Sequence, residues 1–320
     1  MPKLNVQQNN QNIIQAFKNA LAIGNLKGII ASDGNHNFST SGTNPNLLDN
    51  WYFVGGGSQL GDGIFPINQR GQSSYSGGYG IDRWKCWQAS TTTLTASGLT
   101  FATGASGDGL FQYFTQGFYE SLYGKTVTVS AIINGQLYSV TGTASADCWI
   151  ATQFDGDNYI GYICNGNEAN FRISLNGGGR SATIQAAKLE LGTVSTLAND
   201  APPDFGEELR KCQRYLWVET FGANTPIASG IAFNTSSVFD FITPVPMRLG
   251  ATIQITFNVT PYITYGTGNL TLASGVSTPT SGKNGNHLRV QIGTTADAGN
   301  LTEVHLLCGT ETVMTVSCEL

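Results

Sequence analysis

Apolar and polar residues alternate along most of this chain with a period of two, which is typical of β-strands that bury one face. The stretch 127–133 places Val, Val, Ala and Ile at every second position, and Asn134-Gly135 after it is a favoured hairpin turn. The same alternation recurs in Phe171–Leu175, Ala182–Ala186, Ile253–Val259, Leu288–Ile292 and Met314–Leu320. We predict a mainly β protein, with a β-sandwich or jelly roll over residues 47–192 and a small C-terminal β-sandwich domain over residues 215–320.

The N-terminal residues 5–24 follow a period near 3.6 instead, which indicates an amphipathic helix. Its apolar stripe consists of Val6, Ile13, Phe17 and Leu21. A solitary helix of this length is marginal in water without a partner, so we expect the stripe to pack either on another copy of the chain or on the chain's own β domain. Residues 1–33 are therefore assigned to attachment or oligomerisation, and the polar residues 34–46 to a linker.

A short helix is predicted in the connector between the two β domains, residues 193–214. Asp204 stands three residues before Glu207, the spacing of a capping box with Asp as the cap. The helix would continue to about Arg214. Its apolar face would consist of Phe205, Leu209 and Cys212.

The composition narrows the possible partners. Charged residues make up 12% of the chain and the formal net charge is -5, so there is no overall positive field to attract nucleic acid. No apolar run approaches the roughly 20 residues of a membrane span. The Asn- and Gln-rich start does not resemble a signal peptide. We expect no nucleic-acid partner, no membrane insertion and no signal-directed secretion.

Residues for catalysis or metal binding do not fall into recognisable motifs. Asp155-Gly-Asp-Asn158 resembles the start of a calcium loop, but Gly166 stands where the closing Glu of an EF-hand belongs, so a plain β-turn is predicted. Candidate carboxylates for a glycoside hydrolase are Asp108, Asp147, Asp155, Asp157 and Glu168. We expect no enzymatic activity, no cofactor and no bound metal.

The six cysteines contain no C-x-x-C pair and are expected to be free thiols. Val304–Leu320, with a turn near Gly309–Thr312, is predicted to form a hairpin. Cys308 and Cys318 would then lie several residues apart along the ladder, too far for the roughly 7 Å that a disulfide allows between Cα atoms.

Several motifs resemble those of one known group of proteins. They are Asn46–Gly57 (NLLDNWYFVGGG), Phe65–Gln72 (FPINQRGQ), Tyr79–Trp84 (YGIDRW), Ala187–Gly192 (AKLELG), Pro202–Tyr215, Phe241–Arg248 and the terminal Ser317–Leu320 (SCEL). Together they cover about residues 46–320 and resemble tail-fibre-like, receptor-binding appendage proteins of bacteriophages and prophages of gut bacteria.

The resemblance implies a homotrimeric virion appendage with a lectin-like sandwich, made in the host cytoplasm and released by lysis. It would bind bacterial cell-surface glycan during host adsorption, without catalysis, and other virion proteins would be its partners. A purely structural virion component, such as an adaptor or head fibre, is the alternative, and an aromatic-poor outer face of the sandwich would favour it. A glycan depolymerase is a third possibility and would need two acidic residues in a groove.

Aromatic residues are the best candidates for ligand contacts, because flat ring faces stack on sugars while neighbouring polar groups take the hydroxyls. The first three of these motifs, Asn46–Gly57, Phe65–Gln72 and Tyr79–Trp84, are together called the opening motif; it includes Trp51 and Trp84 and is assigned to the fold by the resemblance. We therefore place the candidate glycan site between residues 149 and 162. Its members are Trp149, Asp155, Asp157, Asn158, Tyr159 and Tyr162. The alternative is a hairpin whose aromatics face the core and whose acidic turn is solvated.

Overall fold

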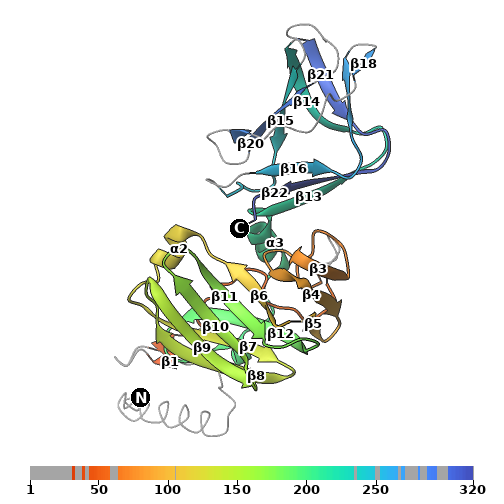
Figure 1. Cartoon of the computed structure of the whole chain (residues 1–320). Coiled ribbons are helices and arrows are strands. Elements are labelled where there is room, and N and C mark those ends of the chain that lie inside the picture. Colours follow the sequence, from red (N-terminus) through yellow and green to blue (C-terminus); the bar gives the residue numbers. More distant parts are fainter. Residues whose placement is uncertain are drawn as a thin grey trace, which may run out of the picture.

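The computed structural model describes residues 31–32, 38–39, 43–57, 64–104, 106–233, 236–248, 253–265, 268–270, 280–281, 287–293 and 302–319. These residues form a mainly β structure, which confirms the predicted fold class. The helix predicted for residues 5–24, with its stripe of Val6, Ile13, Phe17 and Leu21, lies outside the described residues. Figure 1 shows a larger β domain, coloured orange to green, and a second one, coloured teal to blue, with the helix α3 (Phe205–Gln213) between them.

The first domain is built on one ten-stranded antiparallel sheet. Its strands are β3 (Ser74–Tyr79), β4 (Lys85–Thr95), β5 (Gly98–Ala102), β6 (Asp108–Tyr113), β7 (Thr126–Ile133), β8 (Gln136–Thr143), β9 (Asp147–Asp155), β10 (Asn158–Asn165), β11 (Ala169–Leu175) and β12 (Ser181–Leu191). Their order in space is β8-β7-β12-β5-β4-β6-β11-β10-β9, and β3 pairs with β4. The short helix α2 (Gln116–Glu120) and the 3₁₀ turn η1 (Leu197–Asn199) connect or follow these strands.

This sheet closes into two layers because β4 belongs to both. Residues 91–95 of β4 pair with β5, whereas Lys85 and Cys86 pair with β6. The strands β8 and β9, at opposite ends of the order, lie against each other. The buried face predicted from the sequence is confirmed, since Val127, Val129, Ala131 and Ile133 are fully buried between the layers. The polar residues Thr128 and Ser130 between them are buried as well. The tight turn after them is confirmed too, with positive φ at Asn134 and Gly135.

The opening motif forms a buried hydrogen-bond network at one end of the sandwich. Asn50 is fully buried, and its Nδ2 donates to the carbonyls of Ile67 (2.8 Å) and Asp82 (2.9 Å). Its Oδ1 accepts from the amide of Ile67 at 2.7 Å, and the indole of Trp84 donates to its carbonyl at 2.9 Å. Trp51 and Trp84 are buried, so the assignment of this motif to the fold is confirmed.

The motif Ala187–Gly192 supplies Lys188 to a buried ion pair with Asp200. Lys188 is fully buried, and its Nζ donates to Asp200 Oδ2 at 2.5 Å and to the hydroxyl of Thr196 at 2.8 Å. Glu190 Oε2 lies 3.6 Å from the same ammonium group. These contacts fasten the segment after β12 to the sandwich.

The helix α3 follows the prediction closely. Asp204 is its N-cap, with a side-chain oxygen that accepts from the amide of Glu207 at 2.9 Å. Cys212 is fully buried in a small cluster with Phe65 and Ile67 of the opening motif, and Phe205 and Leu209 pack against that cluster. The helix is therefore fixed to the first domain by its apolar face.

The described residues of the second domain form two antiparallel sheets. The first, in the order β13-β22-β16, consists of β13 (Leu216–Phe221), β22 (Thr312–Ser317) and β16 (Gln254–Phe257). The second, in the order β18-β17-β21-β14-β15-β20-β19, consists of β18 (Gly268–Leu270), β17 (Tyr262–Tyr265), β21 (Thr302–Leu307), β14 (Pro226–Phe233), β15 (Ser236–Ile242), β20 (His287–Gly293) and β19 (Thr280–Ser281). Two further short strands, β1 (Ala31–Ser32) and β2 (Phe38–Ser39), pair with each other near the start of the chain.

The hairpin predicted for Val304–Leu320 is wrong. The strand β21 pairs with β14 and β17, whereas β22 pairs with β13 and β16, so the turn between them joins two different sheets. All six cysteines are nevertheless free, as expected. Among the described residues, no helix is long and apolar enough to cross a membrane.

Candidate functional site

The outer face of the layer β4-β6-β11-β10-β9 carries two exposed tryptophans. Trp87 in β4 is 61% exposed and Trp149 in β9 is 60% exposed. Four steps between strands separate β4 from β9 in this layer, which corresponds to roughly 19 Å at the usual strand spacing of about 4.8 Å. The pairing register places Phe111 of β6 opposite Arg172 of β11, and Arg172 opposite Gly161 of β10. Side chains on this face therefore form a row across the sheet.

The row is continuous from one tryptophan to the other. The rings of Trp149 and Tyr159 lie 5.2 Å apart, and the hydroxyl of Tyr159 accepts from Arg172 Nη1 at 3.0 Å. The guanidinium of Arg172 lies 4.4 Å from the ring centroid of Phe111, whose ring lies 6.4 Å from that of Trp87. We call these five residues the aromatic row. Because each member holds its neighbour, the ring faces are positioned before any ligand arrives.

Small residues make room for the aromatic row. A Cβ at Gly109 would lie 2.5 Å from Cζ of Phe111, so that ring lies directly over the glycine. At Gly161 a Cβ would lie 2.9 Å from Cβ of Ala151 on the adjacent strand. A larger residue at Gly109 would displace the Phe111 ring.

An open cleft of about 450 Å³ lies beside the centre of the aromatic row. Trp87, Tyr159 and Arg172 line it together with the polar residues Asp108 and Asn176. Of the described residues that line this cleft, Asp108 is the one carboxylate. Apolar ring faces beside a few fixed polar groups are the usual composition of a small-molecule or sugar site.

The carboxylate of Asp108 is held in place at the edge of this cleft. Its Oδ1 accepts from the amide of Gly109 at 2.6 Å, and its Oδ2 accepts from the hydroxyl of Ser90. A carboxylate oxygen has spare lone pairs beyond these bonds. Asp108 can therefore accept a hydrogen bond from a ligand hydroxyl.

On the same face of the sheet, beyond Phe111, the ammonium group of Lys85 lies near the rings of Tyr79 and Tyr113. Lys85 Nζ lies 5.5 Å from the ring centroid of Tyr113 and 5.4 Å from that of Tyr79. Tyr113 stacks on Phe111 with 5.8 Å between the centroids. Burial, followed by the nearby charge of Glu168, raises the pKa of Tyr113. Its hydroxyl therefore remains a neutral hydrogen-bond donor at neutral pH.

The structure separates the candidate residues predicted from the sequence. Trp149 and Tyr159 lie together in the aromatic row. Tyr162, by contrast, is fully buried between the two layers of the sheet, so its candidacy as a ligand contact is wrong. Asp155 and Asp157 are exposed in the turn between β9 and β10 and do not line the cleft.

Asn158 is buried and has a structural role in this region. Its Oδ1 accepts from the amide of Asn176 at 2.8 Å, while Asn176 Nδ2 donates to the carbonyl of Asp157 at 2.6 Å. These bonds tie the turn between β9 and β10 to the end of β11. Asn158 therefore supports the edge of the cleft through Asn176.

Five residues of the site were absent from the predicted glycan-binding set: Trp87, Asp108, Phe111, Arg172 and Asn176. A signal for two of them existed in the period-2 pattern. Cys86 is buried, so its neighbour Trp87 points outward, and Arg172 stands between Phe171 and Ile173, which are both fully buried. The pairing order that brings β4, β6 and β11 to β10 is not visible in the sequence.

Comparisons with known proteins identified no relative of this chain. No protein-family model matches the chain, and neither a curated protein nor a solved structure matches it. The fold and the site therefore define the class only as a mainly β chain of two β domains, with an aromatic row on the outer face of the first.

Proposed function

We propose that the chain is a virion appendage protein of a bacteriophage or prophage, and that its first domain binds bacterial cell-surface glycan without catalysis. The observation that carries the proposal is the aromatic row, which has a tryptophan about 60% exposed at each end and a polar cleft lined by Trp87, Tyr159 and Arg172. Soluble proteins seldom expose side chains of this size in one row unless they contact a partner. The virion role rests on the motifs that resemble tail-fibre-like proteins.

The chemistry of the aromatic row suits a sugar. The ring faces of Trp87 and Trp149 can stack on the apolar faces of pyranose rings, while Asp108 accepts from hydroxyls and Asn176 can do both. Arg172 is already engaged by Tyr159 and Phe111 and so presents its remaining N–H groups in a fixed direction.

Two other roles are less well supported. A purely structural component would be favoured by an aromatic-poor outer face, and the aromatic row is the opposite. A depolymerase needs a pair of carboxylates about 5 to 9.5 Å apart, and among the described residues lining the cleft Asp108 has no carboxylate partner. A homotrimer remains part of the proposal through the resemblance and the apolar stripe of the N-terminal residues.

The proposal predicts that Trp87→Ala and Trp149→Ala each weaken glycan binding about tenfold, which corresponds to about 1.4 kcal/mol of lost stacking. Because both side chains are largely exposed and each loses one ring contact, the free energy of unfolding should fall by no more than about 1 kcal/mol. A bacterial glycan array, followed by titration of the best ligand, measures the first effect, and thermal unfolding measures the second.

The matched control is Val194→Ala, which shortens another exposed side chain, 69% exposed and outside the aromatic row. This variant should bind like the unaltered protein. If both tryptophan variants keep full glycan binding and full adsorption to host cells, the site lies elsewhere. If the unaltered protein binds no glycan and the tryptophan variants fail to assemble into virions, the chain is a structural virion component instead.

A further inference from the structure

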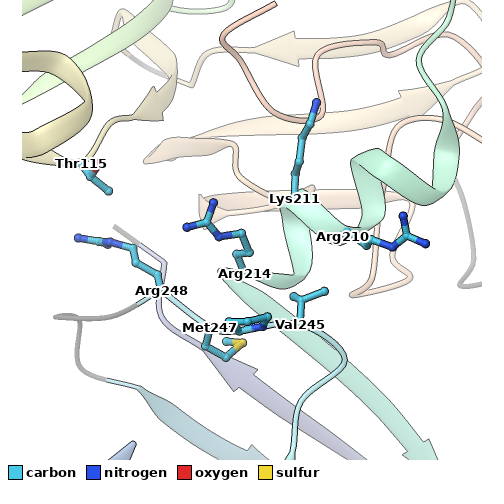
Figure 2. Close-up of a pocket in the computed structure, with 8 residues that line it drawn as sticks. Thr115, Arg210, Lys211, Arg214, Val245, Met247 and Arg248 are labelled. Atoms are coloured by element: carbon cyan, nitrogen blue, oxygen red, sulfur yellow. The ribbon is translucent and has the colours of Figure 1, made fainter. Parts of the chain in front are cut away.

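A cleft lined by basic side chains lies where the connector helix meets the second domain. Its volume is about 710 Å³, and its walls include Arg210, Lys211 and Arg214 at the end of α3 together with Arg248. Figure 2 shows Arg214 and Arg248 extending to the same side, toward Thr115, whereas Arg210 points the opposite way. The side chains of two separate elements thus converge on one space.

A second cavity of about 350 Å³ extends this space into the first domain. It shares Lys211, Arg214 and Arg248 with the larger cavity and continues to Arg83. We call the two cavities together the basic cleft. Its volume is many times the roughly 30 Å³ that one water molecule occupies, so it can hold a ligand of many atoms.

The charges of the basic cleft do not balance. Five of the 16 lysines and arginines line it, Arg83, Arg210, Lys211, Arg214 and Arg248, in a chain whose net charge is -5. Among the described residues that line it, Asp49 is the one carboxylate, and it already accepts from Arg83 Nε at 3.0 Å. Lys211 pairs with Glu208. Within the described chain no carboxylate pairs with Arg210, Arg214 or Arg248.

The backbone holds two of these cations side by side. The amide of Arg248 donates to the carbonyl of Arg214 at 2.9 Å, so the two residues cannot separate without breaking that bond. The negative end of the α3 dipole accounts for cations in the last turn of the helix. It does not account for Arg248 or Arg83, which come from other elements.

Unpaired nitrogen atoms in the basic cleft point to an absent acceptor. Arg83 is 3% exposed; its Nη2 donates to the carbonyl of Tyr113 at 3.0 Å and its guanidinium lies 3.6 Å from the ring centroid of Tyr215. Its Nη1 is buried and has no hydrogen-bond partner among the described residues, and the same holds for Nη1 of Arg248. Buried donors are normally satisfied, and both of these belong to residues that line the same cavity.

We propose that the basic cleft binds an oxyanion, a phosphate or sulfate group that is either free or esterified on a saccharide. Its oxygens accept from Arg83, Arg214 and Arg248, which supplies the missing acceptor and balances the charge. Because these arginines come from the first domain, the connector and the second domain, the bound anion joins the two domains. This site is separate from the aromatic row and does not depend on the glycan proposal.

Calorimetric titration of the full-length protein with sodium sulfate and sodium phosphate, at ionic strength matched with sodium chloride, tests the proposal. We expect binding of at least one of the two anions, and at least tenfold weaker binding in Arg214→Gln and in Arg248→Gln. Arg214 is exposed, so R214Q should fold even if R248Q does not. The matched control is Arg180→Gln, an exposed arginine after β11, which should bind within twofold of the unaltered protein.

The source of the anion is tested with a sulfated disaccharide from heparin and its desulfated counterpart. Sulfated disaccharide that binds at least tenfold more tightly than sulfate supports an esterified group, and equal affinity supports a free anion. No binding of any of these probes by the unaltered protein, or unchanged affinity in R214Q, overturns the proposal. Trp87→Ala and Trp149→Ala should leave anion binding unchanged, so failure of one site is distinguishable from failure of the other.

Discussion

Buried polar residues fix the end of the sandwich nearest the second domain. Asn50 and Arg83 both adopt positive φ, 51° and 71°, which few residues other than glycine do. In each case side-chain hydrogen bonds compensate, to Ile67 and Asp82 from Asn50 and to Asp49 from Arg83. The residues of the opening motif therefore have a physical explanation as parts of one hydrogen-bonded structure.

Asp82 gives the molecule a predictable pH dependence. Its carboxylate is fully buried, and burial raises its pKa to about 7, although Gln69 donates to it from the backbone amide (3.0 Å) and from Nε2 (2.6 Å). An unfolded chain ionises this group near pH 4. Between about pH 4 and pH 7 the folded state therefore holds a proton that the unfolded state has lost, and stability falls as the pH rises, by at most about 1.4 kcal/mol per pH unit.

In Asp82→Asn this part of the pH dependence should disappear. The difference in unfolding free energy between the variant and the unaltered protein should therefore change steadily between about pH 4.5 and about pH 7. Urea unfolding at several pH values measures it. Asp147→Asn, at an exposed position, serves as the control and should run parallel to the unaltered protein. A constant offset between D82N and the unaltered protein would contradict the assignment.

At the scale of strands and helices, the sequence predicts faces better than partners. Alternation identified the buried faces of β7, β11 and β12, because a period of two depends only on which side of the strand meets the core. It could not identify pairing partners. The strands β21 and β22 alternate equally well, and yet residues 308–311 carry the chain from one sheet to another instead of forming a hairpin turn.

In the candidate site, too, the sequence predicts contacts within one hairpin but not contacts between distant strands. Trp149 and Tyr159 could be predicted because they lie on one hairpin, β9-β10, whose pairing is local. Trp87 and Arg172 join them only through the order β4-β6-β11-β10, which is set by contacts far apart along the chain. The prediction for Tyr162 was wrong because side chains alternate between the two faces of a strand. Tyr162 lies three residues after Tyr159, so the two side chains point to opposite faces.

The N-cap of α3 allows a quantitative prediction. In Asp204→Ala the amide of Glu207 loses its acceptor, and the unfolding free energy should fall by about 1 kcal/mol. Denaturant unfolding measures the change. Asp204→Ser keeps an oxygen at the capping position and should recover most of the loss. Equal stability of the alanine variant and the unaltered protein would show that the cap contributes nothing.

At the scale of the whole molecule, polar contacts join the described residues of the second domain to the first. Gln69 Nε2 donates to the carbonyl of Leu216 at 2.7 Å, and Arg70 pairs with Glu319 near the end of the chain. Beside these contacts lies the basic cleft, whose cations repel one another when it is empty. An anion in the cleft would thus make the arrangement of the two domains more rigid.

The oligomeric state is the remaining prediction at this scale. The stripe of Val6, Ile13, Phe17 and Leu21 lacks a predicted partner along the chain, and three parallel copies would bury it in a common seam. Multi-angle light scattering at micromolar concentration should give a mass near three times 34.0 kDa. Charged residues at Ile13 and Phe17 should dissociate the trimer, whereas the same change at Val194, an exposed position just after β12, should not. A monomer in the unaltered protein would exclude the trimer, and a trimer that survives the Ile13 and Phe17 changes would locate its interface in the β domains.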